Sequence, residues 1–398
     1  MNFFNSIPKS INKIHSIICP IYAKGSYVYS SNKRKYLDLT SGIGALSTGH
    51  NHPYVVDKVK DQLDKYVHMP QQVFKTHPIQ VELTEKILKT VEGTNMDNIF
   101  YVNSGSEATE NSIKIARKYT GKSNIIAMNR GFHGRTIAAL SVTSSNLSCR
   151  KGMRPLLSNI FFCNDFTEDS IDNIFNFQSA PEDTAAIILE SVQGEGGIRS
   201  IDTKFLKYLE KISKENNILL IADEVQCGSM RTGTWWDILG KGINPDMITF
   251  GKGIASGYPL AGVMSSSNIM NNIGTSYLGG TYNGNAISSA AASATIDILN
   301  DIELQDHVKS LGIYIKLNLK NDKMIKEIRQ YGLMIAIELI SSNYTKSIVD
   351  ELRSEGILVL TAGNNNQYIR LLPPLNVSVS EIDFFIQKIK KIFRSYTP

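Results

Sequence analysis

Short apolar runs alternate with helix-like segments through the middle of the chain. Runs rich in β-branched and other apolar residues predict strands at 98–103, 124–128, 185–192, 218–225, 247–250 and 261–264. Hydrophobic positions recur at helical spacing between several of these runs, notably at 107–118 and 204–215. Apolar strands separated by helices are typical of a mostly parallel sheet whose two faces are both covered. The pattern therefore predicts an α/β fold.

The pattern changes after about residue 290. It predicts a helix of small residues at 286–299, strands at 333–339 and 369–371, and a closing helix at 380–395. We interpret this region as a second, smaller domain. The predicted division is an N-terminal segment, 1–50, that joins the small domain, a large domain at 51–290, and the small domain at 291–398.

The composition narrows the choice of function. The chain has 398 residues, 42% of them hydrophobic and 20% charged, which is enough for one large core and a smaller one. A formal net charge of +5 fits small anionic ligands and is too diffuse to indicate nucleic acid. No stretch approaches the roughly 20 apolar residues of a membrane span. The four cysteines form no CxxC pair, which favours free thiols in a reducing compartment.

One strand leads directly into a candidate phosphate site. The predicted strand at 98–103 ends in Ser104-Gly105-Ser106, and a helical pattern begins at once. Free backbone N–H groups and the helix dipole attract anions to such a helix N-terminus, and Gly105 allows a close backbone approach. The alternative is an ordinary serine N-cap without a ligand.

Two further strands end in titratable side chains. Asp223 follows the apolar stretch 218–222, and because an unpaired buried carboxylate is costly, we expect it to have a cationic partner. That partner is either the protonated ring nitrogen of a cofactor or an Arg or Lys in a salt bridge. Lys252 stands between two glycines just after the strand at 247–250. Schiff-base chemistry needs a lysine whose pKa is lowered by desolvation, and Lys252 is placed for that.

The segment after the strand at 124–128 is less specific. Phe132 could stack on a flat ring, and Arg135 could bind a carboxylate with two hydrogen bonds. A loop Phe and Arg are more often packing and surface charge, and we interpret His133 as structural. His50 and His52 lack a third ligand, so no metal site is predicted.

Taken together, these segments resemble the class III aminotransferases, a family within fold type I of the enzymes that depend on pyridoxal 5′-phosphate. The resemblance covers nearly the whole chain. It rests on Ser-Gly-Ser-Glu-Ala (104–108), Phe-His-Gly-Arg-Thr (132–136), Gln-Gly-Glu-Gly-Gly (193–197), Ala-Asp-Glu-Val-Gln (222–226), Phe-Gly-Lys-Gly (250–253) and Gly-Gly-Thr-Tyr-Asn-Gly-Asn (279–285). It implies a large domain with a mostly parallel seven-stranded sheet and a smaller α/β domain.

The resemblance also implies how the cofactor is held. Lys252 would form the Schiff base and later move the substrate proton, Asp223 would pair with the pyridine nitrogen, and Gln226 would contact the ring oxygen. Phe132 would stack on the ring.

The phosphate site implies an assembly of two chains. Gly105 and Ser106 would hold the phosphate of the cofactor, joined by Thr281 of the partner subunit. We therefore expect a homodimer with active sites at its interface.

The family likeness implies two substrate arginines. Arg135 would bind the carboxylate remote from the reacting amine, and Arg370 would pair with Glu195 when an ω-amino acid is bound. The α-carboxylate of glutamate or 2-oxoglutarate would displace Glu195 and bind Arg370. One site could then serve both halves of the reaction.

The substrate is less firmly implied. The sequence is closest to 4-aminobutyrate aminotransferases. Ile43 replaces a tyrosine of ornithine aminotransferases, while acetylornithine remains an alternative donor. Ser191 replaces the usual proline, and the stretch 158–181 is shorter than in typical 4-aminobutyrate enzymes. An aminomutase, racemase or phospho-lyase on the same fold, or a protein without activity, are further alternatives.

No acidic residue precedes Asp38, which faintly suggests a transit peptide. The segment from Ile7 onward, including Lys9 and Lys13, nevertheless resembles the start of bacterial 4-aminobutyrate enzymes. We therefore expect a cytoplasmic enzyme with no nucleic-acid or membrane partner.

Overall fold

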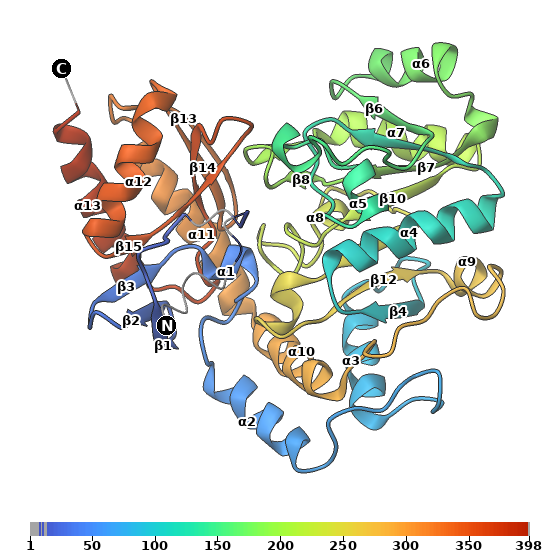
Figure 1. Ribbon diagram of the computed structural model, residues 1–398, viewed down its shortest axis with the longest axis horizontal. Coiled ribbons are helices and arrows are strands. Elements are labelled where there is room, and N and C mark those ends of the chain that lie inside the picture. The colour runs from blue at the N-terminus through green and yellow to red at the C-terminus, as the bar shows by residue number, and fades with distance from the viewer. Residues whose placement is uncertain (1–7, 9, 12–13, 397–398) are drawn as a thin grey trace.

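The computed structural model describes residues 8, 10–11 and 14–396. Ile7, Lys9 and Lys13, which contribute to the N-terminal resemblance, lie outside the described residues. A large part built around one sheet lies beside a smaller part that contains both the first strands and the last helices (Figure 1). The long helix α10 (Ala286–Leu299) lies at the base of the large part and leads into the smaller one.

The large part contains the predicted seven-stranded sheet. Its strands, in spatial order, are β4 (Asn98–Val102), β12 (Ala261–Ser265), β11 (Met247–Phe250), β10 (Leu219–Asp223), β7 (Thr184–Leu189), β5 (Asn124–Met128) and β6 (Ile160–Cys163). β12 is antiparallel to both of its neighbours, and the other pairs are parallel. The prediction of a mostly parallel α/β sheet is confirmed.

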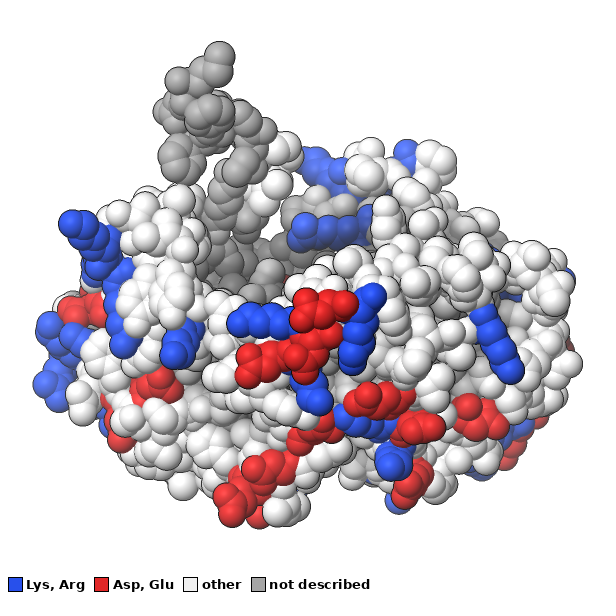
Figure 2. Space-filling model, turned by 90° about the horizontal axis from the view of Figure 1, so that it is seen from below, with Lys and Arg blue, Asp and Glu red and all other residues white. Residues whose placement is uncertain are grey.

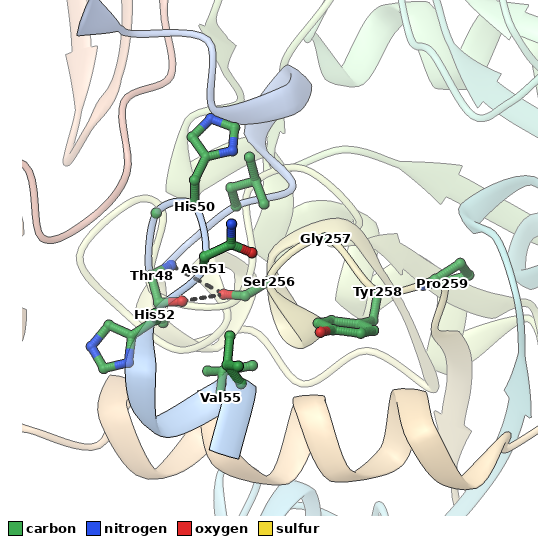
Figure 3. A pocket seen from close by; sticks show the side chains of 12 residues that line it. Thr48, His50, Asn51, His52, Val55, Ser256, Gly257, Tyr258 and Pro259 are labelled. Carbon is green, nitrogen blue, oxygen red and sulfur yellow. Dashed lines mark hydrogen bonds between the residues drawn. The ribbon is translucent and has the colours of Figure 1, made fainter. Parts of the chain in front are cut away.

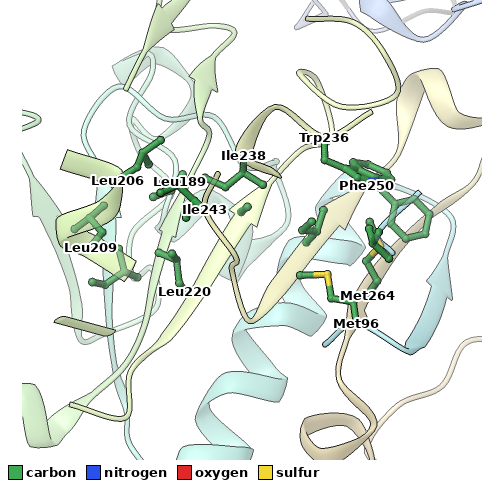
Figure 4. Close-up of a cluster of buried hydrophobic side chains, with 14 of the residues drawn as sticks. Met96, Leu189, Leu206, Leu209, Leu220, Trp236, Ile238, Ile243, Phe250 and Met264 are labelled. Carbon is green, nitrogen blue, oxygen red and sulfur yellow. The ribbon is translucent and has the colours of Figure 1, made fainter. Parts of the chain in front are cut away.

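Alternate residues of the central strands enter opposite cores, which explains their continuous apolar sequences. In β7, Ile187 and Leu189 pack into one buried cluster, whereas Ala186 and Ile188 pack into the cluster on the other face. Figure 4 shows the first cluster, where Leu189 lies near side chains of neighbouring strands and helices. Because both faces are covered by protein, the one charged residue of these seven strands, Asp223, stands at a strand end.

Helices cover the sheet and flank it. They are α2 (Pro53–Leu63), α3 (Pro78–Lys89), α4 (Gly105–Thr120), α5 (Ile137–Ser141), α6 (Glu168–Phe177), α7 (Thr203–Glu215), α8 (Asp237–Gly240), α9 (Ser267–Asn271) and α10. In α7 the apolar residues Phe205, Leu209 and Ile212 recur at helical spacing and are buried, and Asp202 caps its first turn.

The smaller part has two four-stranded sheets. The first has the order β1 (Pro20–Lys24), β2 (Tyr27–Ser30), β3 (Lys35–Asp38), β15 (Ile357–Leu358), and the second β13 (Ile325–Tyr331), β14 (Met334–Leu339), β17 (Tyr368–Leu371), β16 (Leu360–Ala362). The helices α11 (Ile302–Leu319), α12 (Thr345–Ser354) and α13 (Val379–Arg394) pack on them. Leu37 of β3 pairs with Ile357 of β15 in one buried core. This pairing supports the proposed assignment of the N-terminal segment to the small domain.

One predicted strand differs in the structure, and one strand of the sheet was not predicted. The predicted strand at 185–192 is divided, because the chain turns at Glu190 and Ser191 between β7 and the short strand β8 (Val192–Gln193). The edge strand β6 was not predicted, because its four residues, Ile160–Cys163, carry too short a pattern to separate from a loop. The predicted helix at 286–299 is confirmed as α10.

The surface agrees with a mild net charge. On the face in Figure 2, basic and acidic side chains lie next to one another over a largely uncharged surface. Within the described part of the chain, no helix combines the length and the apolar character that crossing a bilayer requires.

The contact between α11 and the β13–β14 turn gives a test of this packing. A Cβ at Gly312 would overlap the backbone carbonyl oxygen of Gly332, so Gly312→Ala should lower the free energy of unfolding by about 1–3 kcal/mol. Thermal unfolding followed by circular dichroism measures this loss. Lys316→Ala, on the exposed face of the same helix, is the control and should change stability by less than about 0.5 kcal/mol. Equal melting temperatures for the two variants would contradict the packing.

Candidate active site

The candidate site lies at one edge of the large sheet. The strands β4, β5, β7, β10 and β11 share one direction, so their carboxyl ends meet at this edge, which we call the carboxyl edge. The residues that end or follow these strands are polar or charged. Ser104 follows β4, Glu190 follows β7, Asp223 ends β10 and Lys252 follows β11. Ligands of open α/β sheets bind outside this edge.

Asp223 has a partner that the sequence did not reveal. Its Oδ2 atom lies 2.7 Å from Nδ1 of His133, and its Oδ1 atom accepts a hydrogen bond of 3.1 Å from the N–H of Val225. Burial opposes protonation of His133, but the hydrogen bond and charge of Asp223 outweigh it and raise the pKa of the imidazole above its usual value. The contact with His133 also fixes the orientation of the carboxyl group of Asp223.

Lys252 begins the 3-10 helix η4 (Lys252–Ala255) with a φ of 45°, in the left-handed region. Burial lowers the pKa of its amine, against the opposing effect of the carboxylates of Glu195, Asp223 and Glu190. No hydrogen bond or ion pair holds its Nζ atom within the part of the chain that the structure describes. Lowering the pKa increases the neutral, nucleophilic fraction of the amine.

Glu190 is a buried acid at the carboxyl edge that sequence reasoning did not identify. Its Oε1 atom accepts a hydrogen bond of 2.8 Å from the N–H of Phe132, and its Oε2 atom accepts one of 3.0 Å from Gly194. Burial raises the pKa of its carboxyl group to about 7. The sequence contains a signal for this residue, since Glu190, like Asp223, comes at the end of a buried apolar strand. Glu190 positions the half-buried Phe132 at the site.

The N-terminus of α4 is open to an anion. Ser104 caps the helix and forms a capping box with Glu107, which confirms the serine N-cap, but the first-turn N–H groups of Gly105 and Ser106 have no acceptor inside the helix. A Cβ at Gly105 would lie 2.7 Å from Cγ1 of Val225. Glycine therefore brings this helix end against the loop that follows Asp223. The two interpretations of the serine motif are compatible.

A salt bridge joins the two parts of the molecule beside the site. Nη1 of the buried Arg370, on β17, lies 2.6 Å from Oε1 of Glu195 and 3.5 Å from Oε1 of Gln226. Burial disfavours the charge of Glu195, but Arg370 outweighs it and holds the pKa of the carboxyl group below its usual range. Glu195 is the one carboxylate that pairs with Arg370 among the residues that the structure describes.

Ile43 lies on an unusual turn that is hydrogen-bonded to the chain just beyond β17. The four residues of α1 (Ser41–Gly44) all have positive φ, and Ile43 has a φ of 63°, which is rare for a β-branched residue. The hydroxyl of Ser41 donates a hydrogen bond of 2.5 Å to the carbonyl of Leu372, two residues beyond Arg370. The side chain of Ile43 is 48% exposed, and this left-handed turn fixes its direction.

Arg135 and Thr281 make fewer contacts than Asp223, Glu190 and Arg370 with the other predicted site residues. Arg135 is exposed, its guanidinium lies 5.9 Å from the ring centroid of Phe132, and its N–H donates to Oγ of Ser106. Thr281 is exposed in the loop before α10. Ser191, which replaces the usual proline, donates a hydrogen bond of 3.2 Å to Oε1 of the buried Glu224.

A separate cavity of about 230 Å³ lies between residues 46–56, which include the start of α2, and residues 256–259, which follow η4. Figure 3 shows His50 and His52 on one side and Tyr258 on the other, with Ser256 hydrogen-bonded to Thr48. His50 is held by Asp38 at 2.9 Å. The cavity is lined by none of the residues gathered around Lys252, so we do not assign the reaction to it.

Comparison with known proteins gives a consistent result. A family model described as aminotransferase class-III matches residues 9–393. A 5-aminovalerate aminotransferase of Pseudomonas putida is 37% identical, over 98% of this chain and 96% of its own. A 4-aminobutyrate aminotransferase of Escherichia coli is 36% identical, with the same coverage of 98% and 96%. An acetylornithine aminotransferase of Bacillus anthracis is 34% identical and covers 94% of both chains.

The fold comparison agrees. The solved structure of an ornithine aminotransferase from Toxoplasma gondii, described with pyridoxal phosphate at its active site, superposes with a TM-score of 0.89 and 26% identity, over 99% of this chain and 93% of its own. The matching family model spans almost the whole chain, and the relatives are similar over their full lengths. The chain therefore belongs to the class III aminotransferases, which depend on pyridoxal 5′-phosphate.

Proposed function

We propose that this aminotransferase moves the terminal amino group of an ω-amino acid, with 4-aminobutyrate as the leading donor, to 2-oxoglutarate, giving the semialdehyde and glutamate. The observation that carries the proposal is the salt bridge between the buried Arg370 and the half-buried Glu195. An arginine that is neutralised by a removable carboxylate can serve a substrate without an α-carboxylate and a substrate with one.

The residues at the carboxyl edge fit pyridoxal 5′-phosphate. Lys252 has an amine without a partner in the described chain, and its lowered pKa suits covalent attachment of an aldehyde. Asp223 is oriented by its hydrogen bond with His133 and can pair with the ring nitrogen. The open first turn of α4 at Gly105 and Ser106 can take the phosphate.

Two more side chains fit the cofactor ring, Phe132 against its face and Gln226 at its oxygen. When bound, pyridoxal 5′-phosphate accepts the amino group and withdraws electrons from the reacting carbon. Nζ of Lys252, once released as a free amine, moves the proton to and from that carbon. His133 supports this step indirectly, because its hydrogen bond orients Asp223.

The salt bridge can act as a switch between two substrates. When the ω-amino acid is bound, Glu195 neutralises Arg370, and Arg135 binds the single, remote carboxylate. When glutamate or 2-oxoglutarate is bound, its α-carboxylate takes the place of Glu195 on Arg370. Leaving Arg370 buried and unpaired would be costly, so one of the two carboxylates must always occupy it.

The donor is inferred from Ile43 and from the relatives. Ile43 presents an apolar side chain, which suits a donor without an α-amino group and disfavours ornithine. The relatives that act on 4-aminobutyrate and 5-aminovalerate are similarly close, and their donors differ by one methylene, a difference of about 1–3 kcal/mol in a pocket. Acetylornithine is the second candidate, supported by relatives of comparable identity.

We further propose a cytoplasmic homodimer. Thr281 of the partner subunit would complete the phosphate site. Large apolar side chains are exposed near the same loop and in the segment before α3, including Val73, Phe74 and Tyr282, as expected of a surface that a second copy covers. The four free cysteines fit a reducing compartment.

The donor can be identified from half-reactions. Adding 4-aminobutyrate to the purified, cofactor-loaded enzyme should convert the bound cofactor to its amine form, followed by absorbance, and 2-oxoglutarate should reverse the change. 5-Aminovalerate, N-acetylornithine, ornithine and β-alanine are tested in parallel. Conversion by N-acetylornithine alone would replace the proposed donor. If no amine changes the absorbance of the bound cofactor, the enzyme catalyses a different reaction from the one proposed.

The switch predicts opposite effects for its two members. Glu195→Gln should slow the 4-aminobutyrate half-reaction about 30-fold, because the neutral amide no longer compensates Arg370, a loss of about 2 kcal/mol. The glutamate half-reaction, in which Glu195 is displaced, should change little. Arg370→Ala should instead abolish the glutamate half-reaction preferentially. Stopped-flow absorbance measures both, with the exposed Glu182→Gln as control. Equal losses in both half-reactions would refute the switch.

The lowered pKa of Lys252 can be measured in the cofactor-free protein. Acetylation by a small reagent should become half-maximal for Lys252 at a lower pH than for Lys204, whose side chain is 88% exposed. The reason is that only the neutral amine reacts, and burial favours the neutral form. Peptide mass spectrometry after timed labelling gives both profiles. Coincident profiles would show that the amine is not perturbed.

A further inference from the structure

The turn that carries Glu195 is held mainly by the small domain. This turn, residues 194–197, connects β8 and β9 (Arg199–Ser200) of the large part and is called the Glu195 turn below. The carbonyl of Glu195 accepts a hydrogen bond of 2.9 Å from the N–H of Gly363, and the carbonyl of Gly197 accepts one of 3.0 Å from Nη1 of Arg329. In Figure 1, β8 lies on the side of the large part that faces β14. The turn therefore bridges the two parts.

The register of the small-domain sheet places Arg329 and Arg370 together. Arg329 on β13 lies opposite Ala336 on β14, and Ala336 lies opposite Arg370 on β17. Residues directly opposite one another share a face of the sheet, so both arginines point to the same side, about 10 Å apart across two strand spacings. Both reach the Glu195 turn, Arg370 at the side chain of Glu195 and Arg329 at the backbone of Gly197.

The ring of Tyr368 packs against the Glu195 turn at Gly197. Tyr368 lies two residues before Arg370 on β17 and so shares its face. A Cβ at Gly197 would lie 2.6 Å from Cε2 of Tyr368, and Gly197 has a φ of 99°. Both the close approach of the ring and the backbone conformation therefore require glycine. The guanidinium of Arg329 lies 4.9 Å from the centroid of the same ring.

The two arginines differ in what they can bind. Nε and Nη2 of Arg329 donate to Oε2 of Glu327 at 2.9 and 2.7 Å, and Glu338 lies 3.7 Å away. Its charge is therefore compensated by its own sheet, and Nη1 is committed to Gly197. Arg370 depends on Glu195 for compensation. A substrate carboxylate thus finds Arg370 available on release of Glu195, whereas Arg329 stays occupied.

We propose that Arg329 is a positioning residue of the switch, which clamps the backbone of the Glu195 turn against the small domain. With the backbone fixed at Gly197, Glu195 leaves Arg370 by rotation of its own side chain and returns to the same place. Without the clamp, each return would also require ordering of the turn, which costs conformational entropy. The inference rests on the proposed function, since it assigns Glu195 the role given above.

The experiment compares Arg329→Met with Lys326→Met in the cofactor-loaded enzyme. Lys326 lies on the same strand and pairs with Glu338 at 2.7 Å, so its loss removes a neighbouring cation but leaves the turn untouched. Arg329→Met should slow the 4-aminobutyrate half-reaction about tenfold, about 1.4 kcal/mol, and leave the glutamate half-reaction within about twofold. Lys326→Met should change neither. Arg329→Lys, which keeps one donor and the charge, should recover part of the loss.

Hydrogen exchange gives a readout that does not depend on catalysis. The amides of residues 194–198 should exchange faster in Arg329→Met than in the parent enzyme, while those of β7 are unchanged. In a Glu195→Gln background, Arg329→Met should slow the 4-aminobutyrate half-reaction no further, because the group that it positions is gone. Additive losses in this double variant, equal slowing of both half-reactions, or unchanged exchange would each overturn the clamp.

The two failures can be told apart. If Glu195→Gln slows both half-reactions equally, the proposed switch is wrong, and the proposed role of Arg329 is wrong as well. If Glu195→Gln separates the half-reactions but Arg329→Met does not, the switch stands and the clamp is wrong.

Discussion

A charge removed from water must have a partner, and this constraint organises the site. The carboxyl groups of Asp223, Glu195 and Glu190 act on the charge of Lys252, and each meets the constraint in a different way. Asp223 has the imidazole of His133, Glu195 has Arg370, and Glu190 accepts two backbone N–H groups and has a raised pKa. Lys252 stands among them with no fixed partner in the described chain. The acids are satisfied before any ligand arrives, so the amine is left free to react.

The same constraint connects the two parts of the molecule. Arg370 belongs to the small-domain sheet, whereas Glu195 belongs to a turn of the large part. Because the ion pair spans the junction, the position of the small domain sets the distance between Arg370 and Lys252. Substrate selection by the proposed switch is thus coupled to the packing of β13, β14 and β17 against the Glu195 turn, and not to the carboxyl edge alone.

Much of the fold was predictable, because the central strands are continuously apolar and the long helices have clear periodicity. Asp223 and Lys252 were found because each ends or follows such a strand. The contact between His133 and Asp223 was not, since the two residues are 90 positions apart and meet only because β5 and β10 both neighbour β7. Arg329 could not be recognised either. Its proposed role depends on the register of an antiparallel sheet, which an alternating pattern does not specify between strands.

The left-handed turn at Ser41–Gly44 has a consequence for how the donor range could evolve. A β-branched residue at a φ of 63° is strained by about 1–2 kcal/mol, and Asn, Asp or Gly would fit that backbone more easily. Replacing Ile43 by a larger apolar or aromatic side chain keeps the strain, whereas replacing it by Asn or Gly relieves the strain and removes the apolar side chain that we propose to favour the donor. Mutational drift at this position therefore runs downhill in energy, away from the proposed selectivity. Under that proposal, the present isoleucine would persist only under selection for the donor.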